Sequence, residues 1–142
     1  MKHYLPEIAW HSREGILTLD VQPVQPSSLG SAHSSSPSSS RCYRLATGSL
    51  ERNIRLWRIY VDAESELACD FLAELQKHSA TINRIRFSPD GEKLASADME
   101  GVILVWMKQK SSEAPDIFAS SVGEILPNKE HWTAVRRLRL PG

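Results

Sequence analysis

The sequence has few cysteines, no long apolar run and no excess of charge of either sign. Only Cys42 and Cys69 occur among the 142 residues, so the dense cysteine framework of a small secreted domain is missing and both thiols are expected to be free in a reducing compartment. The longest apolar run, Val102–Met107, falls far short of the roughly 20 residues that a membrane-spanning helix needs. The opening MKHYLPEIAW lacks the apolar core of a signal peptide. We therefore expect a soluble intracellular protein that does not contact a membrane.

Net charge does not indicate a partner. The 17 basic and 17 acidic residues give a formal net charge of zero, so no overall attraction draws the chain to nucleic acid or to a membrane surface. Arg136, Arg137 and Arg139 form a short basic cluster, but successive residues of one strand point to opposite faces. A solvated strand edge explains this cluster better than contact with phosphate does, and we expect no direct sequence-specific binding of nucleic acid.

Patterns typical of catalysis and metal binding are also missing. None of His3, His11, His33, His78 and His131 forms a close pair with Cys or another His at the spacing of metal ligands. The sequence has no Gly-rich phosphate loop, no nucleophile elbow and no paired carboxylates arranged for acid–base chemistry. We expect no catalytic residues, no cofactor and no metal.

The sequence does contain an internal repeat. The segment RCYRLATGSLERNIRLW and the segment GEKLASADMEGVILVW share the pattern Leu-Ala-Thr/Ser, a short turn, alternating apolar residues and a final Trp. Leu45–Trp57 and Leu94–Trp106 have the same length and lie 49 residues apart. A matched block precedes each copy at an offset of 66 residues, which aligns Ile16, Leu19, Val21 and Pro23 with Ile82, Ile85, Phe87 and Pro89.

Two segments interrupt the repeats. The two offsets differ by 17 residues, and the difference lies between Pro23 and Leu45, where nine of the 14 residues Ser27–Ser40 are serine. Such a segment has too little apolar surface to offset the entropy lost on ordering, so we predict a disordered insertion at residues 25–41. It is either a plain spacer or a phosphorylation target. Residues 108–129 are rich in Ser, Glu, Ala and Pro and are predicted to form a long excursion in the second repeat.

Each repeat is predicted to contain four short strands. Ser88-Pro89-Asp90-Gly91 has the residues of a tight turn. Val102–Trp106 is continuously apolar, as in a strand covered on both faces, whereas Asn53–Trp57 alternates. Phe71–Gln76 and Trp132–Leu138 supply a further strand to each repeat.

At these residues the sequence resembles the WD-repeat family. Blades of this family carry a His before the first strand, Ser or Thr in the second strand, Asp in the tight turn and Trp in the third strand. The resemblance implies a buried chain of hydrogen bonds within each blade. Glu stands where the family has Asp, and its extra methylene loosens the expected geometry. The matching residues are His11, Thr47, Glu51 and Trp57 in the first repeat, and His78, Ser96, Glu100 and Trp106 in the second.

The resemblance predicts an all-β fold, namely the N-terminal part of a WD-repeat β-propeller with about two four-stranded blades. The first blade would comprise residues 1–77 with the insertion at 25–41, and the second blade residues 78–142 with the excursion at 108–129. A closed propeller of this family needs about seven blades to bury its sheet faces and edges. We therefore expect the 142-residue polypeptide to be unstable or prone to aggregate by itself, and we interpret the ending after Leu138 as an alternative transcript end or an incomplete gene model.

A narrower resemblance is carried by EIAWHSREGILTLDVQP, HSATINRIRFSPDGEKLAS and NKEHWTAVRRLR. These segments resemble the WD-repeat middle (p60-type) subunits of chromatin assembly factor complexes, with Hir-type histone chaperones next. The resemblance implies a nuclear, non-enzymatic subunit that binds large and small chromatin-assembly subunits and histones H3-H4 during replication-coupled nucleosome assembly. The alternatives are a Hir-type chaperone that acts independently of replication, a generic adaptor such as a ubiquitin ligase substrate receptor, and an enzyme with these blades as an accessory domain.

Partner contacts are open at this stage. Arg52 and Met99 occupy the tight turns, which in WD-repeat propellers face a rim where partners dock, and both are partner-contact candidates. Trp10 and Trp132 lie outside the repeat-ending positions, so each is a candidate either for a partner anchor or for core packing.

Overall fold

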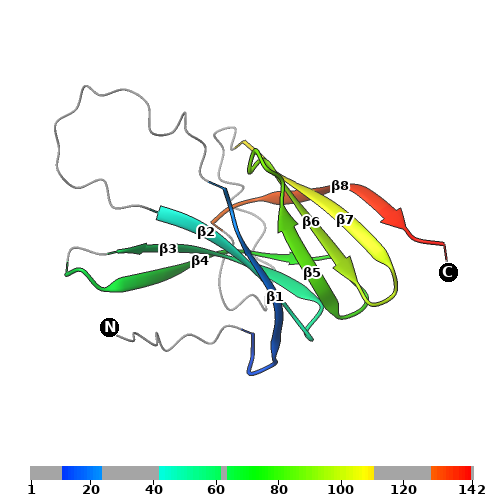
Figure 1. Ribbon diagram of the computed structural model, residues 1–142, viewed down its shortest axis with the longest axis horizontal. Coiled ribbons are helices and arrows are strands. Elements are labelled where there is room, and N and C mark those ends of the chain that lie inside the picture. Colours follow the sequence, from blue (N-terminus) through cyan, green and yellow to red (C-terminus); the bar gives the residue numbers. More distant parts are fainter. Residues whose placement is uncertain (1–10, 24–41, 62–63, 111–128, 142) are drawn as a thin grey trace, which may run out of the picture.

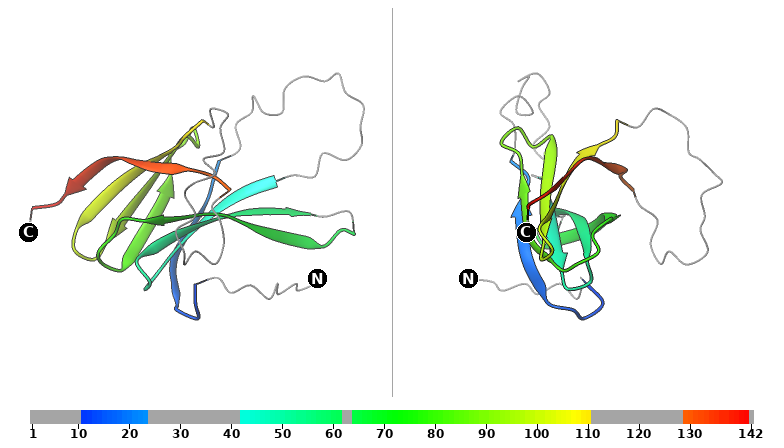
Figure 2. Two further views of the ribbon diagram at one scale, coloured as in Figure 1. Left: turned by 180° about the vertical axis from the view of Figure 1, so that it is seen from behind. Right: turned by 90° about the vertical axis from the view of Figure 1, so that its right-hand side faces the viewer.

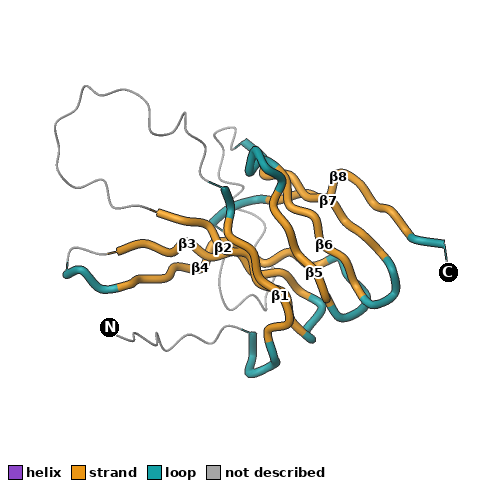
Figure 3. The backbone as a smooth tube through the Cα atoms, viewed as in Figure 1, coloured by secondary structure: helices purple, strands orange, loops and turns teal. Residues whose placement is uncertain are grey.

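The computed structural model describes residues 11–23, 42–61, 64–110 and 129–141, and every element in this part of the chain is a β-strand (Figures 1 and 3). The strands form two antiparallel four-stranded sheets, in the orders β1-β2-β3-β4 and β5-β6-β7-β8. The predicted all-β fold with two four-stranded blades is confirmed. No helix that could cross a membrane occurs among the described residues. The strands are β1 (Ile16–Val21), β2 (Cys42–Ser49), β3 (Asn53–Val61), β4 (Leu67–Gln76), β5 (Ile82–Phe87), β6 (Lys93–Asp98), β7 (Val102–Lys108) and β8 (Trp132–Arg139).

The two sheets lie on either side of the blade boundary expected after residue 77. The first sheet ends at Gln76 and the second begins at Ile82. The predicted insertion at 25–41 and residues 111–128 of the predicted excursion lie outside the described part of the chain. One bound is wrong: Lys108 is the last residue of β7 and pairs with Trp132 of β8, because the ladder continues past Trp106.

The pairing of the strands repeats from one sheet to the other. Leu19 lies opposite Thr47 in the first sheet, and Ile85 lies opposite Ser96 in the second. A β-bulge bends a strand and redirects its side chains, so bulges at matching places give the two sheets the same shape. They occur between Ile16 and Thr18, between Ile82 and Arg84, between Leu56 and Trp57, and between Val105 and Trp106.

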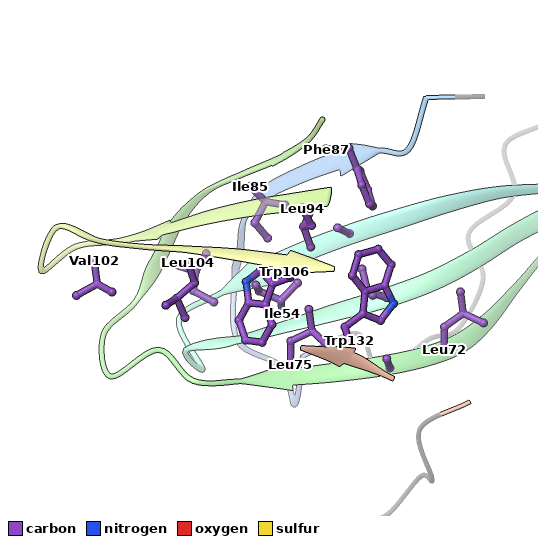
Figure 4. Close-up of a cluster of buried hydrophobic side chains, with 14 residues drawn as sticks. Ile54, Leu72, Leu75, Ile85, Phe87, Leu94, Val102, Leu104, Trp106 and Trp132 are labelled. Atoms are coloured by element: carbon purple, nitrogen blue, oxygen red, sulfur yellow. The ribbon is translucent and has the colours of Figure 1, made fainter. Parts of the chain in front are cut away.

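The hydrophobic core lies between the two sheets, which pack side by side (Figures 1 and 2). Trp106 lies among these side chains, and Trp132 contributes its ring from β8 (Figure 4). The Trp132 ring meets Phe87 edge-on, with centroids 6.4 Å apart. Of the two roles that the sequence left open for Trp132, partner anchor or core packing, the structure shows core packing. The core comprises Ala46, Ile54, Leu56, Leu72, Ala73, Leu75, Ile82, Ile85, Phe87, Leu94, Val102, Leu104, Trp106 and Trp132.

The matched apolar block is buried in only one of the two sheets. Ile82 and Ile85 are fully buried because β5 packs against β1 and β2 of the first sheet. The equivalent residues of β1 are exposed: Ile16 by 40% and Leu19 by 56%. No described sheet covers that face of β1, so the same apolar pattern meets solvent there.

Side chains of β1 satisfy the free backbone groups of β5. Because β5 is the edge strand of its sheet, some of its N–H groups need partners outside the ladder. The amide of Ile85 donates to Thr18 Oγ1 at 3.1 Å, and the amide of Phe87 donates to Asp20 Oδ2 at 2.7 Å. The two sheets are thus joined by hydrogen bonds as well as by apolar packing.

A second connection between the sheets involves Arg44 and Glu130. The Arg44 guanidinium forms a two-pronged ion pair with the Glu130 carboxylate, and its Nε lies 3.1 Å from Oε2. The same carboxylate accepts hydrogen bonds from Lys108 Nζ and Trp132 Nε1, each at 3.0 Å. Partial burial tends to raise the pKa of Glu130, but these donors outweigh it and hold the pKa below its usual value. We call this cluster the Arg44–Glu130 clasp.

Candidate functional site

Three short connections of the two sheets lie at one end, which we call the turn rim. It comprises the β2–β3 turn (Leu50–Arg52), the β4–β5 connection (Lys77–Thr81) and the β6–β7 turn (Met99–Gly101). The two turns end on residues with positive φ, Arg52 at 69° and Gly101 at 77°. The amide of Met99 donates to Thr81 O at 3.0 Å, which holds the last turn against the connection.

In the second blade, a buried chain of hydrogen bonds runs from a Trp to a carboxylate. Trp106 Nε1 donates to Ser96 Oγ at 2.9 Å, and the Ser96 hydroxyl lies 2.7 Å from His78 Nε2. His78 Nδ1 lies 2.7 Å from Asp98 Oδ2, and the side chains of both residues are completely buried. A hydroxyl that donates to Nε2, with the ring proton on Nδ1, satisfies every group in this chain.

The carboxylate of this chain is Asp98, so the prediction that Glu100 would bind His78 is wrong. Glu100 is exposed, and its carboxylate accepts from Ser79 Oγ at 3.4 Å. Side chains two residues apart on a strand share a face, so Asp98 at the end of β6 points with Ser96 toward the imidazole. Asp98 also accepts the amides of Glu100 and Val102, each at 3.0 Å. The alternation of Ser96 and Asp98 in the sequence was the signal that could have identified it.

In the first blade, the structure brings together all four residues that the resemblance implied. Trp57 Nε1 donates to Thr47 Oγ1 at 2.9 Å, and that hydroxyl lies 2.9 Å from His11 Nε2. His11 Nδ1 lies 3.1 Å from Glu51 Oε2. It also lies 2.9 Å from the hydroxyl of Ser49, a residue that the sequence reasoning missed.

The hydrogen-bond chains of the two blades differ because the last residue of the second strand differs, Ser49 in β2 and Asp98 in β6. Ser49 is the equivalent of Asp98 at the repeat offset of 49 residues, and it brings no charge to the imidazole. Glu51 reaches in from the turn instead, and its carboxylate also pairs with Arg55 Nη2 at 3.2 Å. Burial is the main cause that lowers the pKa of His11 below 6.5, opposed in part by the bond to Glu51.

An open groove of about 700 Å³ lies on the turn rim between the β2–β3 turn and the β4–β5 connection. Arg52 stands at its edge, where Nη1 donates to Ser79 O at 3.3 Å. Met99, the other partner-contact candidate, is 70% exposed on its own turn and does not line the groove. The lining residues are Ser12, Leu50, Glu51, Arg52, Asn53, Arg55, Gln76, Lys77, His78 and Ser79.

Groups suited to metal binding or thiol chemistry do not gather in the described part of the chain. No three His, Cys, Asp or Glu side chains there could hold a metal ion together. Cys42 and Cys69 are both free thiols, as predicted. Burial, helped by the charge of Asp70, raises the pKa of Cys69 to about 11, which disfavours the reactive thiolate.

Comparison with known proteins gives the family. Residues 1–140 match the family described as the CAF1B/HIR1 beta-propeller domain. The chain is 34% identical over 139 residues to a chromatin assembly factor 1 subunit of Mus musculus, a match that covers 98% of this chain and 22% of the relative. Identity to the corresponding chromatin assembly factor 1 subunit of Saccharomyces cerevisiae is 28% over 146 residues, with 94% of this chain and 28% of the relative covered.

Hir proteins are also among the relatives. Protein HIR1 of Kluyveromyces lactis is 30% identical over 105 residues, which are 67% of this chain and 12% of the relative. The chain thus spans less than a third of the length of these three curated relatives. The resemblance to chromatin-assembly and Hir-type proteins predicted from the sequence is confirmed, and the chain belongs to the CAF1B/HIR1 β-propeller domain family.

Proposed function

We propose that this chain is a non-enzymatic binding scaffold of a histone chaperone assembly that acts in chromatin assembly. The observation that carries the proposal is the match of residues 1–140 to the CAF1B/HIR1 beta-propeller domain. Relatives that match 98% and 94% of the chain are named as subunits of chromatin assembly factor 1.

The use of polar side chains supports a scaffold rather than an enzyme. His11 and His78 are both engaged in the blade hydrogen-bond chains. Every buried side-chain nitrogen or oxygen in the described part of the chain has a hydrogen-bond partner. Residues that are committed to each other in this way stabilise the fold, which leaves the rim surfaces for binding.

The extent of the matches favours one branch of the family. The match to the mouse chromatin assembly factor 1 subunit covers 98% of this chain, whereas the match to the K. lactis HIR1 covers 67%. As the first candidate we therefore propose a nuclear role in replication-coupled assembly, together with large and small chromatin-assembly subunits and histones H3-H4. A Hir-type chaperone that acts independently of replication is the second candidate, favoured by the HIR1 match itself. A generic WD-repeat adaptor is the third.

Co-purification separates these candidates. The full chain, carrying an affinity tag, is expressed in cells and the captured proteins are identified by mass spectrometry, with Asp98→Ala as the control that disrupts the second blade. Histones H3-H4 together with a large chromatin-assembly subunit are expected, along with nuclear fractionation of the chain. Capture of H3-H4 with Hir partners would move the chain to the second branch. Capture of a cullin-type ligase without histones, or the same proteins from the control, would contradict the proposal.

A further inference from the structure

The groove on the turn rim is formed by two segments. Only a few of their residues, such as Glu51 and His78, take part in the blade hydrogen-bond chains. One wall is the β2–β3 turn with Leu50 and Arg52, and the other is the β4–β5 connection with Lys77 and Ser79. Glu51, which lines the groove with them, is already engaged by His11. The outward side chains on both walls lie outside the hydrophobic core between the two sheets.

The charges in the groove leave two cations available to a ligand. Arg55 is held by the carboxylates of Glu51 and Glu74, at 3.2 and 3.4 Å. Arg52 is exposed, and its single bond to Ser79 O leaves most of its five N–H donors for other acceptors. Lys77 is exposed and forms no ion pair with any residue in the described ranges. The groove therefore offers positive charge from both of its walls.

The backbone at Arg52 points to a use for its side chain. Its φ of 69° is in the left-handed region, where the equivalent residue of the second blade is Gly101 with φ 77°. A residue with a Cβ is strained in this conformation, whereas glycine adopts it readily. An observed strain of this kind supports a functional hypothesis, and here the strained residue carries the cation at the groove edge. Leu50, two residues before it, is 45% exposed.

We propose that this groove binds a short acidic segment of a partner protein. Two carboxylates of the segment pair with Arg52 and Lys77, and an apolar side chain between them packs on Leu50. This inference deepens the proposed scaffold role and rests on it. Histones are basic and do not complement these cations, so the groove serves an acidic non-histone component of the assembly.

The surroundings of the cations favour a peptide over nucleic acid. Glu51 lines the groove, Glu74 is bound to Arg55 beside it, and the chain has no net charge. A continuous phosphate backbone needs an extended row of cations, whereas two separate carboxylates fit two separate cations next to one apolar side chain.

Peptide binding to the tethered full chain tests the proposal. The chain is attached at low density to a sensor surface, and the probe is the peptide Asp-Glu-Leu-Asp-Glu, compared with its neutral analogue Asn-Gln-Leu-Asn-Gln. The double variant Arg52→Gln with Lys77→Gln is expected to bind the acidic peptide about tenfold or more weakly, because both charge contacts are lost. The matched control, Arg136→Gln with Arg137→Gln, removes the same charge from two exposed residues of β8 and is expected to leave binding within about twofold.

A second variant keeps the test independent of folding. Arg52→Gly removes the cation while relieving the backbone, so it is expected to weaken peptide binding without lowering the thermal unfolding midpoint. Equal loss in the control pair, equal binding of the neutral peptide, or unchanged binding by Arg52→Gly would overturn the proposal. Binding of a short oligothymidylate through the same two residues, in preference to the peptide, would overturn it as well. Failure of peptide binding in a chain that still captures H3-H4 would refute the groove alone, and the reverse result would refute the chaperone role alone.

Discussion

At the scale of single residues, the two blades meet the same hydrogen-bonding need with carboxylates at different positions. His78 binds Asp98 at the end of β6, whereas His11 binds Glu51 in the turn and Ser49 at the strand end. Besides its bond to His78, the Asp98 carboxylate accepts hydrogen bonds from two backbone amides. Burial tends to raise the pKa of Asp98, but these bonds and the bond from His78 prevail and keep it below the usual value.

Replacement of Asp98 is therefore expected to be far more costly than replacement of Glu100. Asp98→Ala leaves His78, the buried amide of Val102 and the partly buried amide of Glu100 without their acceptor, and we expect a loss of about 3–5 kcal/mol in the free energy of unfolding. Glu100→Ala removes an exposed carboxylate and should change it by no more than about 0.5 kcal/mol. Urea denaturation followed by tryptophan fluorescence measures both, and equal losses would restore Glu100 as the partner of His78.

The His11 imidazole should make stability depend on pH. Its pKa in the folded chain is below 6.5 because it is buried beside Arg55, so the unfolded chain takes up the proton first as the pH falls. The contribution of His11 is therefore complete above about pH 6.5 and is lost as the pH falls through its lower folded pKa. Urea midpoints at pH 7.5 and 5.5 measure this loss, and His11→Gln should reduce the difference between them. An unchanged difference in His11→Gln would contradict the assignment to His11.

At the scale of the elements, close approach of the two sheets depends on a glycine in β2. A Cβ on Gly48 would lie 2.7 Å from Ile85 Cδ1, 2.9 Å from Ile82 Cγ2 and 3.0 Å from Thr18 Cγ2. Both isoleucines are completely buried in the core between the sheets, so they have little room to move. Gly48 thus allows β2 to contact β5.

Gly48→Ala is expected to separate the sheets and to cost about 1–3 kcal/mol of unfolding free energy through overpacking. The matched control is Gly15→Ala, because a Cβ on Gly15 meets no atom within 4 Å; its effect should stay within about 0.5 kcal/mol. Thermal unfolding by circular dichroism compares the two variants. Equal midpoints would show that the sheets do not pack as closely as described.

The repeat in the sequence was enough to predict the strands and their equivalence. Trp57 and Trp106 are equivalent at the offset of 49 residues. Each donates a hydrogen bond from Nε1 to the equivalent hydroxyl, that of Thr47 or of Ser96. The exposure of Leu19 could not be predicted, because an apolar pattern indicates which face seeks cover and not whether a sheet is there to cover it. Asp98 was missed as the partner of His78 because the family pattern places the carboxylate in the tight turn, where this sequence has Glu100.

At the scale of the whole molecule, the pair of sheets has one apolar interface between them and apolar side chains on the faces that point away from each other. Leu17 and Leu19 are 50% and 56% exposed on β1, and Val135 and Leu138 are 48% and 53% exposed on β8. Contiguous exposed apolar surface on a sheet commonly marks a site of association.

The 142-residue polypeptide is expected to self-associate through these faces as its concentration rises. Leu19→Gln combined with Val21→Thr should reduce the association, whereas Leu50→Gln combined with Met99→Gln, on the turn rim, should not. Size-exclusion chromatography with light scattering measures the mass of each variant. A monodisperse monomer at every concentration tested would contradict this expectation.

The two ends of the sheets also differ in what they connect. The strand ends at Val21 and Cys42, and those at Lys108 and Trp132, border the segments that contain residues 24–41 and 111–128, and they lie at the end of the Arg44–Glu130 clasp. The groove is at the opposite end, about 25 Å away along β2 for a strand of eight residues. A fluorescent reporter inserted between Val21 and Cys42 would therefore be attached to strand ends that lie opposite the groove. Such a chimera would let the position of the chain in living cells be followed while the groove stays accessible to a ligand.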